Sequence, residues 1–229
     1  MKTIGLLGGM SWESTADYYK NINTGIKQKL GKLHSAKIAM VSVDFEPIEV
    51  LQHKGDWEGT AKILSCAAKD IESANADFLL ICTNTMHKVV PQIEKNINIP
   101  ILHIADATAD ELINDGIKKV GLLGTAFTME QDFYKDRLKE KELEVLVPDK
   151  EGRALIHKVI YEELCLGIVN ESSKKEYIKI INKLIDQGCE GVILGCTEIG
   201  MLVKPEDVET KVYDTTLIHA KKAVEMALS

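Results

Sequence analysis

DFLLICTNT at residues 77–85 recurs as EGVILGCTE at residues 190–198, and this repeated stretch decides the fold. In each copy an acidic residue leads into an apolar run, and small polar residues follow at once. Such a run predicts a buried parallel strand that ends in a turn. The two copies indicate two similar halves that differ at one position: Thr83 in the first copy corresponds to Cys196 in the second, 113 residues later.

Short apolar runs alternate along the whole chain with amphipathic helical patterns, which predicts an α/β fold of parallel sheets flanked by helices. Two of the expected helices, residues 58–73 and 174–186, are followed by Asn75 and Gly188, residue types that tolerate the left-handed conformation that closes a helix. The expected strands cover residues 3–7, 37–43, 78–82, 101–104, 119–123, 144–147, 191–194 and 211–213.

The repeat extends beyond these two stretches. IGLLGG at residues 4–9 recurs as VGLLGT at residues 120–125, and the aromatic pair that follows the first stretch has a counterpart after the second. We therefore expect two homologous lobes, with residues 1–102 plus 210–229 in the first and residues 103–209 in the second. In this division the last helix packs on the first lobe.

Composition narrows the classes of function. The 229 residues carry a net charge of −7 with acidic and basic residues interspersed, and the clustered Lys and Arg of a nucleic-acid surface are missing. We expect no membrane association, because no apolar run approaches spanning length. The five cysteines form no C-x-x-C pair, which favours reduced thiols in the cytoplasm.

Small polar residues follow the expected strands at the carboxyl ends, where ligands bind in parallel α/β sheets. The glycine spacing fits no nucleotide-binding motif, and the scattered histidines fit no metal site. Cys196 opens a turn after a strand, where a helix N-terminus lowers a thiol pKa and makes the thiolate a nucleophile or a base. Cys82 is expected to point into the core, because side chains alternate along a strand.

Two polar segments near these strand ends have open roles. His87 lies four residues after Thr83, about one helical turn further on, and we expect it to help order that site. QHKGDW at residues 52–57 either supplies groups that bind a carboxylate or is simply solvated.

GLLGGM at residues 5–10, TNTMH at residues 83–87 and GCTE at residues 195–198 together resemble the cofactor-independent aspartate/glutamate racemase family. The resemblance covers essentially the whole chain and includes VIYEEL at residues 159–164. Hydantoin racemases, maleate isomerases and arylmalonate decarboxylases share the same framework.

The resemblance implies a two-lobed, pseudo-twofold fold with the active site between the lobes, usually as a homodimer. It implies a small-molecule acidic amino acid as substrate and no cofactor, neither pyridoxal phosphate nor metal. In the family's two-base mechanism one group removes the α-proton from one face and another delivers a proton to the opposite face, so the catalytic pair here is Thr83 and Cys196. The positions that match the family's substrate contacts are Met10, Ser11, Asn84, Thr85, Thr125, Thr197 and Glu198.

The chain departs from the family's pattern at two places. Thr83 occupies the position of the first catalytic cysteine, and its hydroxyl is a much weaker acid than a thiol. We therefore expect Cys196 to be the main base, acting on the L-enantiomer, and Thr83 to serve the D-face directly or through a relay. The family's arginine and lysine anchors for the substrate side chain are replaced, and Gln52, His53 and Lys54 are candidate substitutes.

The first interpretation is a racemase of aspartate and/or glutamate, an isomerase. Two alternatives stay open: a single-cysteine decarboxylase or isomerase of a dicarboxylate, since one thiol suffices to reprotonate one face, and a small-molecule-binding regulator that kept the framework without the chemistry.

Overall fold

A computed structural model describes residues 1–229 and divides the chain into two compact units. The first unit contains Met1–Ile104 and His219–Ser229, and the second contains Ala105–Ile218. Both are α/β units with parallel strands, as the alternating pattern predicts. No helix is long and apolar enough to cross a membrane.

The first unit is built on a three-stranded sheet of order β2-β1-β3. Ile4 at the start of β1 pairs in register with Ile38 of β2 and with Phe78 of β3. Its elements are β1 (Ile4–Gly8), α1 (Trp12–Leu30), β2 (Ile38–Ser42), α2 (Phe45–His53), α3 (Trp57–Ser73), β3 (Phe78–Ile81), the 3-10 helix η1 (Thr85–Val89) and α4 (Val90–Glu94).

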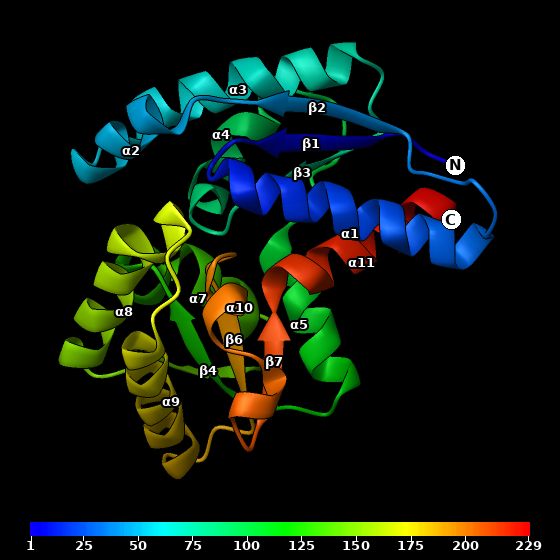
Figure 1. Cartoon of the computed structure of the whole chain (residues 1–229). Helices are drawn as coiled ribbons and strands as arrows, with labels where there is room; N and C mark the ends of the chain where they lie inside the picture. Colours follow the sequence, from blue (N-terminus) through cyan, green and yellow to red (C-terminus); the bar gives the residue numbers. More distant parts are fainter. The chain divides into compact units, whose positions relative to one another are not determined.

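Side chains that alternate along the strands of this sheet belong to two separate hydrophobic cores. Leu7, Leu79 and Ile81 pack against α3 and α4, while Leu6 and Leu80 pack on the other face against α1 and the end of the last helix. Figure 1 shows the same layering, with α3 over one face of the sheet and α1 and α11 (Thr215–Leu228) over the other. Each fully buried aliphatic side chain contributes about 1.5–3 kcal/mol, so these two cores hold the carboxyl edge of the sheet in place.

The second unit carries a four-stranded sheet of order β5-β4-β6-β7. Apart from β7, this order matches that of the first sheet, with β4, β5 and β6 in the places of β1, β2 and β3. Its elements are α5 (Ile104–Asn114), β4 (Lys119–Gly124), α6 (Ala126–Glu130), α7 (Asp132–Lys139), β5 (Glu144–Leu146), α8 (Lys150–Glu162), η2 (Leu164–Leu166), α9 (Glu171–Asp186), β6 (Gly191–Gly195), α10 (Ile199–Leu202), η3 (Pro205–Asp207), β7 (Lys211–Asp214) and α11 (Thr215–Leu228). Helix α5 begins at the last residue of the first unit, and the part of α11 from His219 onward belongs to the first unit.

Seven of the eight expected strands are present, and their ends are shifted by at most one residue. The prediction for residues 101–104 was wrong: only Ile101 forms a bridge, to Leu79, and Ile104 already begins α5. Asn75 and Gly188 have positive φ angles of 62° and 91°, which confirms the expected left-handed helix ends.

Residues 210–218, assigned from the sequence to the first lobe, lie in the second unit, because β7 is hydrogen-bonded to β6. The first unit extends two residues further than the expected boundary, to Ile104.

Candidate active site

The turn after β1 brings Met10 and Ser11 to the carboxyl edge of the first sheet. Gly9 has a φ of 97°, and a Cβ there would collide with the backbone of Val43, so only glycine fits this position. Ser11 then caps α1: its hydroxyl oxygen accepts a hydrogen bond from the Ser14 backbone N–H at 3.3 Å. Met10 and Ser11 are both buried.

The end of β3 brings Thr83, Asn84 and Thr85 to the same edge. Asn84 and Thr85 are buried, whereas Thr83 remains partly exposed. Cys82, one residue earlier, is fully buried in the core beside α1, and burial raises the pKa of its thiol far above its ordinary value. The alternation prediction for Cys82 is therefore confirmed, and its thiol is packed as a hydrophobic side chain.

The three candidate side-chain anchors after β2 have different surroundings. Gln52, at the end of α2, is only 2% exposed, and its amide donates to the Met86 sulfur at 3.7 Å. His53 is half exposed and pairs with Glu49 at 2.8 Å, and Lys54 is exposed. Among the three, only Gln52 has its side chain buried near the segment that carries Thr83.

In the second unit, Thr125 follows β4 and caps α6. It is buried, and its hydroxyl oxygen accepts a hydrogen bond from the Thr128 backbone N–H at 3.3 Å. Thr125 occupies the same place after β4 that Gly9 occupies after β1, in accord with the repeat in the sequence.

Cys196, Thr197 and Glu198 follow β6 and form a compact group. The Cys196 thiol donates to Glu198 Oε2 at 3.0 Å, and the Thr197 hydroxyl donates to the same oxygen at 2.7 Å. Glu198 is buried, so one carboxylate oxygen accepts two hydrogen bonds in a water-poor environment. This arrangement places a proton acceptor directly beside the thiol.

The pKa of Cys196 is shifted upward. Cys196 is 8% exposed, and burial raises the pKa of its thiol well above the ordinary value, with a further increase from the negative charge of Glu198. The sequence predicted a pKa lowered by a helix N-terminus, and this was wrong. The helix that follows, α10, is only four residues long, and burial and the carboxylate outweigh it. In the resting protein Cys196 is therefore a thiol.

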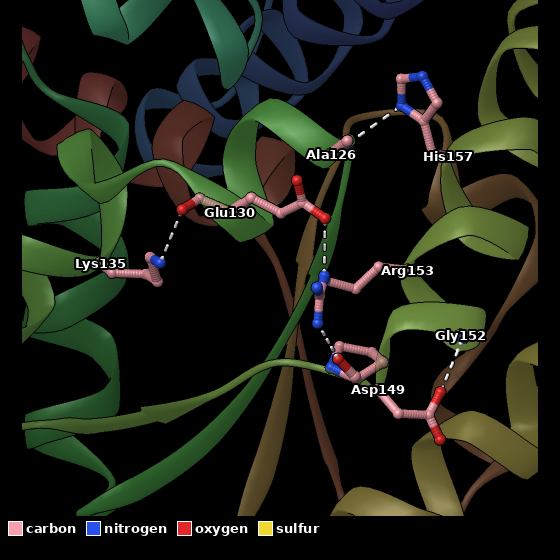
Figure 2. A network of polar contacts seen from close by, with 8 residues as sticks. Ala126, Glu130, Lys135, Asp149, Gly152, Arg153 and His157 are labelled. Atoms are coloured by element: carbon pink, nitrogen blue, oxygen red, sulfur yellow. Dashed lines mark hydrogen bonds and ion pairs between the residues drawn. The ribbon is translucent and has the colours of Figure 1, made fainter.

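His157 contacts the segment that follows Thr125, and the sequence did not indicate this contact. Figure 2 shows its ring directed at the start of α6, where its Nδ1 accepts the Ala126 backbone N–H at 3.1 Å. Arg153, one turn earlier on α8, donates to Glu130 at the end of α6 at 2.8 Å. These two contacts tie α8 to both ends of α6 and so fix the segment that begins with Thr125.

The structure thus collects the candidate residues at two strand edges. Thr83 and the candidates Met10, Ser11, Asn84 and Thr85 lie at the carboxyl edge of the first sheet, and Gln52 on α2 contacts Met86, which follows Thr85. Thr125, Cys196, Thr197 and Glu198 lie at the carboxyl edge of the second sheet. No group of three or more His, Cys, Asp and Glu side chains is arranged to hold a metal ion.

Comparison with known proteins places the chain in a family. The family model for the Asp/Glu/hydantoin racemases matches residues 7–223. The broad specificity amino-acid racemase RacX of Bacillus subtilis is 21% identical over 99% of this chain and 98% of its own length.

Two solved structures are similar over the full length of both chains. A putative Asp/Glu racemase from Yersinia pestis has 53% identity and a TM-score of 0.93, and an aspartate racemase homologue from Pyrococcus horikoshii has 39% identity and a TM-score of 0.87. These matches confirm the resemblance seen in the sequence. The chain belongs to the Asp/Glu/hydantoin racemase family, whose racemases are isomerases that act without pyridoxal phosphate.

Proposed function

We propose that this racemase acts on acidic amino acids, aspartate and/or glutamate, with Cys196 as its main base. The observation that carries the proposal is the Cys196 thiol, buried and 3.0 Å from the Glu198 carboxylate. A thiol with a raised pKa becomes a base only when a neighbour takes its proton, and Glu198 is placed to do so.

The proposed reaction begins with the transfer of the Cys196 proton to Glu198. The thiolate then takes the α-proton of the L-substrate, and the electron pair of the broken C–H bond remains as a carbanion delocalised into the substrate carboxylate. Thr83 donates its hydroxyl proton to the opposite face while a water molecule reprotonates the hydroxyl oxygen. The hydroxide left behind is neutralised by the proton that Glu198 releases.

Substrate binding is assigned to the remaining side chains at the two edges. Hydroxyl, amide and backbone N–H groups stabilise a carboxylate and the charge that develops on it without a metal, and Ser11, Asn84, Thr85, Thr125 and Thr197 supply such groups. Buried Gln52 is our candidate for the contact with the substrate side chain, in preference to exposed His53 and Lys54.

Proton exchange in D₂O tests the proposal. With L- and D-forms of aspartate and glutamate, NMR is expected to show loss of the α-proton and formation of the opposite enantiomer. Cys196→Ala is expected to lose exchange from the L-forms. Exchange retained by this variant would refute the role of Cys196, and turnover of malonates or maleate without α-proton exchange would identify a decarboxylase or isomerase instead.

We also propose, as expected from the sequence, that the protein is a homodimer and is located in the cytoplasm. Analytical ultracentrifugation of the purified chain and fractionation of the cells that make it test these two proposals.

A further inference from the structure

The backbone carbonyl of Thr83 is held by a buried histidine. His87, 2% exposed, has its Nδ1 2.8 Å from the Thr83 oxygen, and its Nε2 accepts the Ile104 backbone N–H at 3.2 Å. Since Nε2 accepts, the ring proton is on Nδ1 and is donated to Thr83. Both nitrogens are engaged with the backbone, so His87 is placed to orient Thr83 and not to exchange protons with a substrate.

The far end of this contact is itself fixed. The segment that leads to Ile104 is joined to β3, because Leu102 N–H donates to Leu79 at 2.9 Å. The Leu102 carbonyl in turn accepts from His219 Nε2 at 2.7 Å, and Tyr18 holds the other ring nitrogen of His219 at 2.8 Å. His87 therefore bridges Thr83 to a point anchored from two sides.

Thr83 depends on such bridges, because it lies in neither a strand nor a helix. β3 ends at Ile81, and η1 begins at Thr85. The carbonyl before Thr83, that of Cys82, accepts the Ser14 hydroxyl at 3.3 Å, and the carbonyl of Thr83 itself accepts from His87. These two contacts set the direction of the bond from Cα to Cβ, and with it the position of the hydroxyl.

We propose that His87 is a positioning residue that aims the Thr83 hydroxyl at the substrate's α-carbon, an inference that rests on the function proposed above. Its effect is confined to one half of the reaction. Removal of the α-proton from the L-enantiomer belongs to Cys196 and Glu198 in the second unit, while delivery of a proton to the opposite face belongs to Thr83.

Loss of the His87 contact therefore changes the share of the carbanion that is protonated on the Thr83 face relative to the share that is protonated on the Cys196 face. With Thr83 misplaced, the carbanion formed from L-substrate in D₂O persists long enough for the Cys196 thiol to exchange the abstracted proton for the deuteron on Glu198, and the thiol then returns α-deuterated L-enantiomer. The ratio of deuterated L to deuterated D formed early in the reaction measures this division. It is independent of how much of the preparation is active.

Two substitutions separate the two hydrogen bonds of the ring. Asn has its amide nitrogen where the ring has Nδ1, so His87→Asn keeps the donor to Thr83. Gln has its amide oxygen where the ring has Nε2, so His87→Gln keeps the acceptor for Ile104 and loses the donor to Thr83. His34→Gln, at an exposed position in the loop before β2, is the matched control.

The expected result with L-aspartate or L-glutamate is a ratio raised about tenfold by His87→Gln, within the loss of up to ~10²-fold that a misplaced catalytic group causes. His87→Asn and His34→Gln are expected to keep the wild-type ratio. If folded His87→Gln kept the wild-type ratio while exchange and racemisation fell together, His87 would be a structural residue. That result would overturn this inference and leave the proposed function intact. Equal ratios in both His87 variants would also overturn it. A wild-type protein that exchanges no α-proton would overturn the proposed function itself.

Discussion

Replacing Glu198 by Gln is expected to change the reactivity of Cys196 and the rate of turnover in opposite directions. Glu198 Oε2 accepts the thiol proton across 3.0 Å, and its charge adds to burial in raising the thiol pKa. Gln keeps the shape and removes both the charge and the basic oxygen. The pKa of Cys196 therefore falls, although burial, the larger cause, keeps it above the ordinary value of a cysteine.

The size of the effect on turnover follows from the geometry. Because the thiol and the carboxylate are in direct contact, the variant is expected to lose the full contribution of a positioned general base, which is about 10²- to 10⁴-fold in rate. We expect kcat for racemisation of the L-substrate to fall within that range. Alkylation of Cys196 by iodoacetamide is expected to become faster at neutral pH, because more of the thiol is ionised.

The assay follows alkylation of the Cys196 peptide by mass spectrometry as a function of pH, which separates it from exposed Cys66, and racemisation by polarimetry. Glu140→Gln, an exposed change in the same unit, serves as the control. Unchanged kcat in Glu198→Gln would show that the thiol proton goes elsewhere. Slower alkylation would show that the carboxylate does not hold the thiol in its protonated form.

Three further predictions concern stability. Burial lowers the pKa of His219 to about 4, so its ring stays neutral in the folded protein. In the unfolded chain the ring has its ordinary pKa of 6.5 and takes up a proton when the pH falls below that value. Stability is therefore lost as pH falls through that window, by about 2 kcal/mol between pH 7 and pH 5, and urea unfolding should show a flatter pH dependence for His219→Gln. Gly9→Ala is expected to cost about 1–3 kcal/mol in urea unfolding because of its positive φ and the contact with Val43; an unchanged midpoint would refute that reasoning. Cys82→Ala is expected to lose about 1 kcal/mol of stability and keep its racemisation rate, and loss of the rate at unchanged fold would give Cys82 a role in the chemistry.

Most of the fold could be predicted because its signals are local. Each strand is a short apolar run between turn residues, and each long helix repeats its buried positions at helical spacing. ILHI at residues 101–104 misled for the same reason: it looks like a strand. Instead, Ile101 forms a single bridge to β3 and Ile104 begins α5, so tertiary contacts decide the conformation of this segment.

The place of the candidate residues at strand ends could be predicted from the sequence, but their surroundings could not. Cys196 follows β6, as expected, yet its pKa depends on burial and on the direction of the Glu198 side chain, which no spacing reveals. In the same way, Gln52, His53 and Lys54 are equivalent polar residues in the sequence. Only the helical turn of α2 buries the first and exposes the other two.

The path of the last helix has a consequence for synthesis of the protein. The core between α1 and the first sheet is completed by Ala220, Ala223, Val224 and Ala227, which follow the whole second unit in the chain and therefore leave the ribosome after it. The second unit is one continuous segment and is complete when Ile218 has emerged. The unit whose translation begins first is therefore completed after the other. Until residues 220–227 have emerged, the nascent chain still exposes the apolar face of α1.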